Sequence, residues 1–325
     1  MAGKSHRKGL TIWEIAEKFG TEDKARQWLE NMRWPNGVTC PRCGSTEVVR
    51  TTHPTQTHRC RECRRVGEKD QFNVKTDSVM ANSNISLRNW AIGIYLYSTE
   101  IKGVSSMKLH RKIGIGQKAA WFMLHRLRDA AQSKGGTGFS GPVEVDETYF
   151  GGKRKNMSNA RRAAMSGSGA VGKTAVVGMK DRDTGKVKAA VAEKTDKKTL
   201  HGFVQDNADS DAKVYTDGAK VYKGLPFDHE TVNHSVNEYV RGKAHTNGIE
   251  SHWALMKRGY VGIYHKMSPK HLQRYVSEFE QRHNFRELDT ADQMKSVVSG
   301  MTGRQLGYRD LIADNGLDNG ARTKE

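Results

Sequence analysis

The chain has 325 residues and a formal net charge of +18, with 36% hydrophobic and 28% charged residues. This composition excludes a disordered chain, and the length allows two or three domains. The longest apolar run, WAIGIYLY, falls far short of the roughly 20 residues that a membrane-spanning helix needs. Residues 1–135 hold 24 Lys and Arg against 12 Asp and Glu, which indicates a polyanionic partner, usually nucleic acid.

Residues 1–35 predict an N-terminal helical segment. Apolar residues recur at helical spacing on both sides of Gly20, and Thr21 is a candidate N-cap for the second helix. The basic first ten residues are followed by no apolar segment. We therefore expect no signal peptide and a cytoplasmic protein.

Residues 36–75 contain all four cysteines of the chain, Cys40, Cys43, Cys60 and Cys63. They form two C-x-x-C pairs separated by 16 residues, a spacing typical of zinc ribbons, and a short hairpin is predicted between them. Disulfides are disfavoured in the cytoplasm. We expect one structural Zn²⁺, because four thiolates close the coordination shell. Six arginines crowd this segment, so it is expected to touch a phosphate backbone, with a protein–protein role as the alternative.

Residues 84–135 predict a helical region. ISLRNWAIGIYLYST has the pattern of a buried helix, and Ser105 opens a short helix that the turn IGIG separates from a basic one. The second helix carries Lys118 and Arg126, which are candidate DNA contacts. Two helices about a short glycine-bearing turn resemble a helix-turn-helix, although an ordinary helical hairpin has the same pattern.

Residues 141–288 predict a separate domain beyond the glycine-rich segment QSKGGTGFSGP. Three strands are expected first, the last two joined at Asp183–Gly185, followed by alternating helices and strands. This order predicts a mixed sheet flanked by helices, so the whole chain is multidomain α+β. Residues 289–325 are treated as a C-terminal tail.

The segment GSGAVGKT, residues 167–174, matches the phosphate-binding pattern G-x-x-x-x-G-K-[ST]. That pattern binds phosphates only where a strand precedes it and a helix follows. Here a basic segment precedes it and the β-branched strand TAVVGM follows. We therefore expect no ATP binding, and interpret residues 153–173 as a flexible basic loop near nucleic acid.

Three carboxylates could meet in this domain. Asp146 lies near the end of the first strand, Asp217 ends the fourth strand before a glycine, and Glu250 begins a helix. If the two strands are neighbours, these oxygens suit one or two Mg²⁺ ions, with Mn²⁺ as a substitute. Glu144 and Glu147 compete with Asp146 on spacing alone.

The helix after Glu250 has two predicted faces. Ile249, Trp253 and Met256 should face the core. Lys257 lies seven residues after Glu250 on a neighbouring face, from which it could reach a phosphate, and Arg258 is a second candidate DNA contact.

The motifs VEVDETYFGGK, GKTAVVGM, VYTDGAKVY and HTNGIESHWALMKRG together resemble bacterial insertion-sequence DDE transposases with a ribonuclease-H-like core, in the subgroup with an N-terminal zinc ribbon. The resemblance covers residues 36–285. It implies that Asp146, Asp217 and Glu250 bind the catalytic metals, and that Lys257 contacts DNA.

The resemblance also implies a nucleoid-associated transposase that binds double-stranded DNA, both the terminal repeats of its element and the target, and that assembles there as a homo-oligomer. It would hydrolyse a phosphodiester and transfer the freed 3′ end to target DNA. A zinc-ribbon DNA-binding regulator without catalysis, and a metal-dependent nuclease without strand transfer, are the alternatives.

Overall fold

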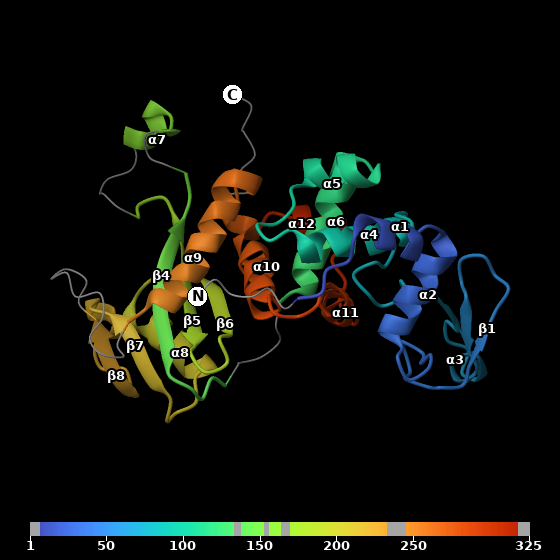
Figure 1. The fold of residues 1–325 in the computed structure, drawn as a ribbon, viewed down its shortest axis with the longest axis horizontal. Helices are drawn as coiled ribbons and strands as arrows, with labels where there is room; N and C mark the ends of the chain where they lie inside the picture. The colour runs from blue at the N-terminus through green and yellow to red at the C-terminus, as the bar shows by residue number, and fades with distance from the viewer. Residues whose placement is uncertain (1–6, 133–137, 153–155, 164–169, 233–244, 318–325) are drawn as a thin grey trace. The chain divides into compact units, whose positions relative to one another are not determined.

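A computed structural model describes residues 7–132, 138–152, 156–163, 170–232 and 245–317 (Figure 1). The chain divides into two compact units. The first comprises Met1–Gln132 together with Glu287–Ala313, and the second comprises Ser133–Arg286 together with Asp314–Glu325. No helix in the described part of the chain has both the length and the hydropathy that a membrane crossing requires.

The first unit opens with helices α1, Ile12–Lys18, and α2, Glu22–Arg33. The Thr11 hydroxyl accepts the Glu14 backbone N–H and the Glu14 carboxylate accepts the Thr11 N–H, which together form a capping box. Thr21 caps α2 through the Lys24 N–H, as the sequence predicted.

The zinc-ribbon segment follows as three short antiparallel strands in the order β1-β2-β3, with bounds Val48–Arg50, His58–Cys60 and Gln71–Phe72. The one-turn helix α3, Arg61–Arg65, begins directly after Cys60. The predicted hairpin between the two cysteine pairs is the β1–β2 pair.

The helical region consists of α4, Leu87–Thr99, α5, Ser106–Ile113, and α6, Gln117–Ala130. Ser105 caps α5 through the Lys108 N–H, and Gly114 ends α5 in the left-handed conformation with φ 69°. The predicted turn between two short helices is therefore present. In α4, Trp90, Ala91 and Ile94 are fully buried, in agreement with the predicted buried helix.

Two further helices, α11, Thr290–Gly300, and α12, Tyr308–Ile312, lie in the segment that the sequence suggested was only a tail. Met294, Val297 and Val298 of α11 are buried in the same core as α2, α4 and α6. Gly300 is required where α11 ends, because a Cβ there would lie 2.5 Å from the Ala130 carbonyl oxygen. Residues 290–312 are thus an integral part of the first unit.

The second unit is built on a five-stranded mixed sheet in the order β6-β5-β4-β7-β8. The strands β4, β5 and β6 are antiparallel, whereas β7 and β8 run parallel to β4. Their bounds are Val143–Phe150, Thr174–Asp181, Val187–Ala192, Lys213–Asp217 and Asp228–Val232. This is the arrangement expected of the predicted ribonuclease-H-like core. Thr174 is the first residue of β5, so a strand and not a helix follows the GSGAVGKT match.

Helices cover both faces of this sheet (Figure 1). Helix α8, Lys197–Asn207, packs on one face, and α9, Asn247–Gly259, and α10, Leu272–Asn284, pack on the other. A 3₁₀ turn, Lys220–Tyr222, lies between β7 and β8, where the sequence predicted that helices and strands would alternate. The remaining elements are α7, Asn159–Ala163, a π-helical turn, Tyr260–Tyr264, and a 3₁₀ turn, Pro269–His271.

Candidate active site and metal centre

The strands β4 and β7 bring Asp146 and Asp217 together. They pair in parallel, with Val143 opposite Val214 and Glu144 opposite Tyr215. Continuing this register by two residues sets Asp146 level with Asp217, on strands that lie about 4.8 Å apart. Asp146 is the fourth of eight residues in β4 and not near the end of the strand as predicted, but the neighbour relation is the one that the sequence required.

The Asp146 carboxyl group is in an electrostatically unfavourable place. Burial raises its pKa to about 7, and the charges of Glu147, Asp217 and Glu250 add to the effect. Beyond burial, the raised pKa reflects the charges of nearby acidic groups on β4, β7 and α9. Perturbed groups of this kind are typical of functional sites.

The raised pKa gives a prediction for stability. The pKa of Asp146 is about 7 in the folded chain and 3.8 in the reference state, so the folded form binds more protons between these values. The contribution of Asp146 to the free energy of unfolding should therefore fall as pH rises from about 4 to 7, by up to about 4 kcal/mol, whereas the buried His252 and His283, whose pKa values are lowered, contribute in the opposite direction. Urea denaturation of the full-length wild type and of Asp146→Asn in buffer without added Mg²⁺ isolates the Asp146 contribution as the difference between the two. The stability of Asp146→Asn relative to the wild type should rise from pH 4 to 7, and a difference that does not change with pH would contradict the assignment.

Glu250 lies in the first turn of α9 and is exposed. The Thr246 hydroxyl donates to Glu250 Oε1 at 2.9 Å. Among the described residues, only the four cysteines have ligand atoms all within 4.8 Å of one another, so the three carboxylates do not share one tight ligand shell here. Carboxylate oxygens are nevertheless ligands that suit Mg²⁺ in type and in charge.

The two competing glutamates have other partners. Glu144 is 2% exposed and accepts the Arg182 Nε–H at 2.8 Å and the Ile249 backbone N–H at 3.0 Å. Glu147 accepts the hydroxyl of the buried Tyr222, while burial and the charge of Asp217 raise the pKa of this glutamate. Of the three, Asp146 is the carboxylate whose pKa, already raised by burial, is raised further by the charges of both Asp217 and Glu250.

Trp253 takes part in the site in a way that the sequence did not reveal. Its indole Nε1–H donates to Asp146 Oδ2 at 3.0 Å, and the ring packs against Gly178, where a Cβ would lie 2.5 Å away. Gly178 is the cross-strand partner of Asp146. The sequence predicted Trp253 only as a core residue, and its burial at 3% exposure confirms that part.

The four cysteine side chains form a closed cluster. Sulfur–sulfur distances are 3.7 Å for Cys40 to Cys63, and 3.5 Å from Cys43 to both Cys60 and Cys63. A tetrahedral Zn²⁺ with bonds of about 2.3 Å requires sulfurs about 3.8 Å apart, whereas a disulfide requires about 2.05 Å. The cluster therefore fits one structural Zn²⁺.

The predicted DNA contacts have different surroundings. Lys257 and Arg258 are exposed in the last turn of α9. Lys118 is exposed too, with its Nζ 4.5 Å from the centre of the Tyr308 ring. The prediction for Arg126 needs correction. Arg126 is 6% exposed, its Nε–H donates to the Leu306 carbonyl, and its guanidinium lies over Phe122. These contacts within the first unit occupy Arg126, so it does not suit a DNA contact.

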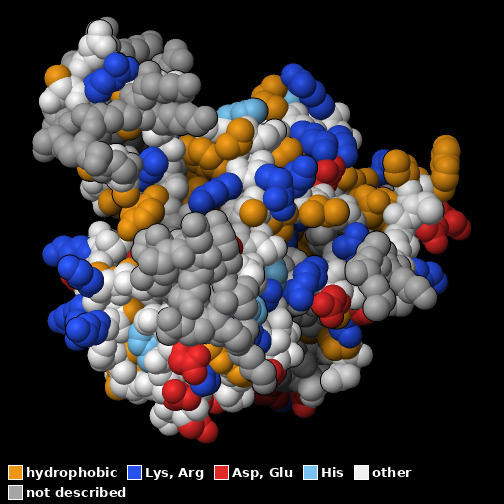
Figure 2. Space-filling model, turned by 60° about the vertical axis from the view of Figure 1, so that its left-hand side comes forward, with side chains coloured by type: hydrophobic (Ala, Val, Ile, Leu, Met, Phe, Trp, Pro, Cys, Tyr) orange, Lys and Arg blue, Asp and Glu red, His pale blue; other side chains and the backbone are white. Residues whose placement is uncertain are grey.

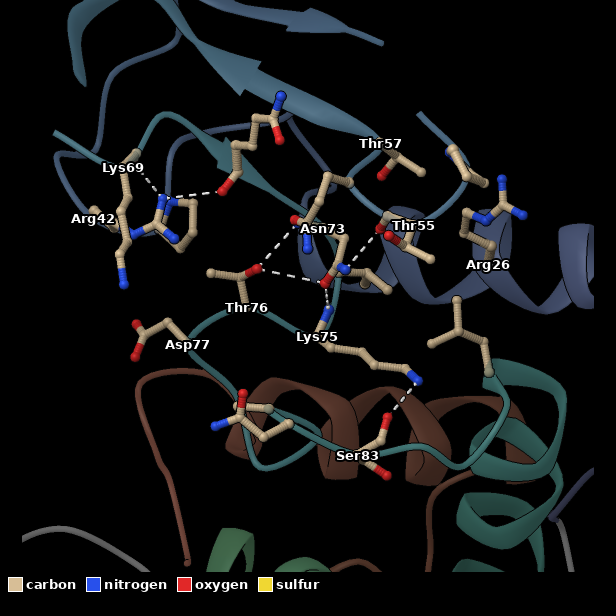
Figure 3. A pocket seen from close by; sticks show the side chains of 18 of the residues that line it. Arg26, Arg42, Thr55, Thr57, Lys69, Asn73, Lys75, Thr76, Asp77 and Ser83 are labelled. Carbon is tan, nitrogen blue, oxygen red and sulfur yellow. Dashed lines mark hydrogen bonds between the residues drawn. The ribbon is translucent and has the colours of Figure 1, made fainter. Parts of the chain in front are cut away.

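Basic side chains are spread widely over the face drawn in Figure 2, whereas acidic ones occur there in a few small groups. The first unit also has a pocket of about 1300 Å³ beside the ribbon (Figure 3). Its wall is mostly polar and includes Arg26, Arg42, Lys69 and Lys75. Arg42 donates to the carbonyls of Lys69 and Gln71, which holds the ribbon side of the pocket. Such a wall suits a polar ligand, in contrast to the mostly apolar sites of small-molecule cofactors.

Comparison with known proteins agrees with this architecture. Residues 138–284 match the family model of the ISXO2-like transposase domain, and residues 20–66 match that of the transposase zinc-ribbon domain. A protein of the transposable element ISH50 from Halobacterium salinarum, described as uncharacterized, is 29% identical over 293 residues, which cover 86% of this chain and 97% of that protein.

The mixed sheet, the carboxylate site and these matches define a DDE transposase, a class of polynucleotidyl transferases. Residues 138–284 are thus an ISXO2-like transposase domain, and residues 20–66 are a transposase zinc-ribbon domain. The resemblance was expected among bacterial insertion sequences, and the relative from an archaeon shows that it extends beyond bacteria. Membership of this family also implies that the chain binds DNA.

Proposed function

We propose that this chain is an active insertion-sequence transposase that cuts at the terminal repeats of its element and joins the freed 3′ ends to target DNA. The proposal depends on one observation above all, the parallel β4–β7 register that, continued by two residues, sets Asp146 level with Asp217; burial raises the pKa of Asp146, and the charges of Asp217 and Glu250 add to this. Sites for catalytic Mg²⁺ are built from carboxylates that converge in this way.

Each residue has a proposed part. Asp146, Asp217 and Glu250 hold divalent cations, two in number, with Mn²⁺ as a substitute. When bound, such ions supply activation of the attacking oxygen and stabilisation of the leaving oxygen. Lys257 and Arg258 neutralise backbone phosphates near Glu250, since all three are exposed on α9. The first unit, with its ribbon and Lys118, binds the terminal repeats, and the protein acts there as a homo-oligomer.

The test uses duplexes that carry the inverted repeats flanking the coding sequence, a supercoiled target plasmid and Mg²⁺. The proposal predicts Mg²⁺-dependent nicking at the repeat end, followed by joined products. Cleavage without joining would favour a nuclease, and binding without nicking would favour a regulator. In the nicking assay Asp217→Asn should bind the duplex but leave it intact.

Lys257 gives a prediction about binding. Lys257→Ala should weaken the affinity for duplex DNA similarly for all sequences, and should reduce the slope of log affinity against log salt by about 1, because one phosphate contact is lost. Fluorescence anisotropy at several salt concentrations measures both quantities. Lys186→Ala, a change of an exposed lysine in the turn between β5 and β6, is the matched control and should leave the slope unaltered. Equal slopes for the wild type and Lys257→Ala would remove this contact from the proposal.

A further inference from the structure

The first turn of α9 is capped from another part of the chain. Its N-cap residue, Thr246, makes no side-chain hydrogen bond to the helix backbone, and its hydroxyl donates to Glu250 instead. The acceptor that an N-cap side chain usually supplies comes from Glu144 on β4, whose Oε2 accepts the Ile249 N–H at 3.0 Å. A carboxylate at this end of a helix is also favoured by the helix dipole.

Glu144 is itself held on several sides. Arg182 Nε donates to its Oε1 at 2.8 Å, and His245 Nδ1 lies 3.2 Å from the same oxygen. The Arg182 guanidinium lies 4.1 Å from the centre of the Tyr215 ring and also donates to the His245 carbonyl. The Glu144 side chain is therefore held in one position, because its buried carboxylate pairs with the Arg182 guanidinium, which itself contacts Tyr215 and His245.

The approach of the helix to this point is close. A Cβ on Gly248 would lie 2.7 Å from Glu144 Oε2 and 2.9 Å from Lys180 Nζ. Only glycine fits here without a shift of the helix start or of the glutamate. Lys180 is the cross-strand partner of Glu144, and its Nζ lies 3.5 Å from the Gly248 carbonyl.

We infer that Glu144 is a positioning residue, which fixes Glu250 relative to Asp146 by tying the first turn of α9 to β4. Asp146 lies two residues after Glu144 on the same face of that strand, and Glu250 directly follows the Ile249 that Glu144 binds. Together with the hydrogen bond from Trp253 of α9 to Asp146, this contact sets the offset between two of the three proposed metal-binding carboxylates. The inference rests on the proposed function, because it assumes that Glu250 binds a cation.

The test measures Mn²⁺ binding by electron paramagnetic resonance on the full-length, zinc-loaded protein without DNA. Groups that orient metal ligands typically change metal affinity by about 10–100-fold when they are removed. We expect Glu144→Ala to lose affinity within that range. In Glu144→Gln the Mn²⁺ affinity should fall by less than about tenfold, because the glutamine amide oxygen can still accept the Ile249 N–H. Gly248→Ala, which removes no charge, should weaken Mn²⁺ binding by pushing the helix start away from the sheet.

The matched control is Glu280→Ala. Glu280 is also a buried glutamate of the second unit, 6% exposed, which accepts the Ala189 N–H and pairs with Lys188, but it lies on α10. The Glu280→Ala variant should be less stable than the wild type but should bind Mn²⁺ with unchanged affinity. This result would separate a positioning role from a general loss of stability. If Glu144→Ala does not fold, Glu144→Gln and Gly248→Ala decide the matter.

The outcomes also separate this inference from the proposed function. A wild-type protein that binds no Mn²⁺ and cleaves no DNA would overturn both. A wild type that binds Mn²⁺ and cleaves, together with Glu144→Ala and Gly248→Ala that bind Mn²⁺ equally well, would overturn the positioning role alone. Weakened binding in Glu280→Ala of the same size would overturn it too.

Discussion

Replacing Asp146 with asparagine is expected to slow Mg²⁺-dependent cleavage of terminal-repeat DNA by about a thousandfold or more. A catalytic cation contributes several kcal/mol of transition-state stabilisation, and each 1.36 kcal/mol corresponds to a factor of ten in rate. The fold should tolerate the change, because a neutral amide avoids both the burial of a charge and the repulsion that together raise the pKa of Asp146, and its oxygen can still accept the Trp253 indole N–H. Single-turnover nicking of labelled duplex measures the rate.

The matched control for this variant is Asp228→Asn. Asp228 lies on β8 of the same sheet with its side chain 68% exposed, beside Lys213. The Asp228→Asn variant should cleave at the wild-type rate. Both Asp228→Asn and Asp146→Asn should bind DNA with the affinity of the wild type. Retention of more than about a tenth of the wild-type rate by Asp146→Asn would show that the carboxylate is not essential.

Loss of zinc from the ribbon is the other change with a large expected effect. Metal binding contributes on the order of 10 kcal/mol to the folding of small zinc modules. Cys40, Cys60 and Cys63 belong to the same buried cluster as Trp34 and Phe72, so the ribbon is continuous with the core of the first unit. Cys43→Ser should therefore leave the protein with less than one equivalent of zinc and lower the Tm of that unit by about 10 °C or more.

Zinc content by mass spectrometry and calorimetric melting check this expectation. His53→Ala is the control, because His53 is exposed in the β1–β2 connection and its Nδ1 accepts the Gln56 N–H. It should retain one zinc per chain. Full zinc content in Cys43→Ser, with an unchanged Tm, would contradict the four-thiolate site.

Local patterns in the sequence predicted much of this structure. Successive residues of a strand point to opposite faces, so Asp146 lies on the face opposite the buried Val143 and Val145. Helical spacing predicted that Ile249, Trp253 and Met256 are buried, as they are. The paired cysteines likewise predicted the cluster in which their sulfurs meet. Each of these inferences needs only a local pattern within one segment: the two-residue repeat of a strand, the 3.6-residue repeat of a helix, or the three-residue spacing of a cysteine pair.

What the sequence did not show depends on contacts between distant segments. Arg126 is a basic residue on a basic helix, which made it a candidate DNA contact. Its packing role becomes visible only in the fold, where it is buried against Leu306, 180 positions away. Helix α11 is an exception, because its buried Met294, Val297 and Val298, with Met301 at its C-cap, recur at helical spacing, a signal in the sequence that the expectation of a tail overlooked. The hydrogen bonds that Arg182 and Ile249 donate to Glu144 also depend on the tertiary fold. Sequence spacing alone left Glu144 and Asp146 as equal candidates for the metal-binding carboxylate.

The return of residues 287–313 to the first unit has a practical consequence for dissecting this protein. Residues 133–286, the main part of the second unit, are inserted in the sequence of the first. A fragment that stops at residue 132 would lack Met294, Val297 and Val298, and would expose the apolar surfaces that these side chains cover. An isolated first unit should therefore be made by joining residue 132 to residue 287 through a flexible linker, and truncation alone should give an aggregating product.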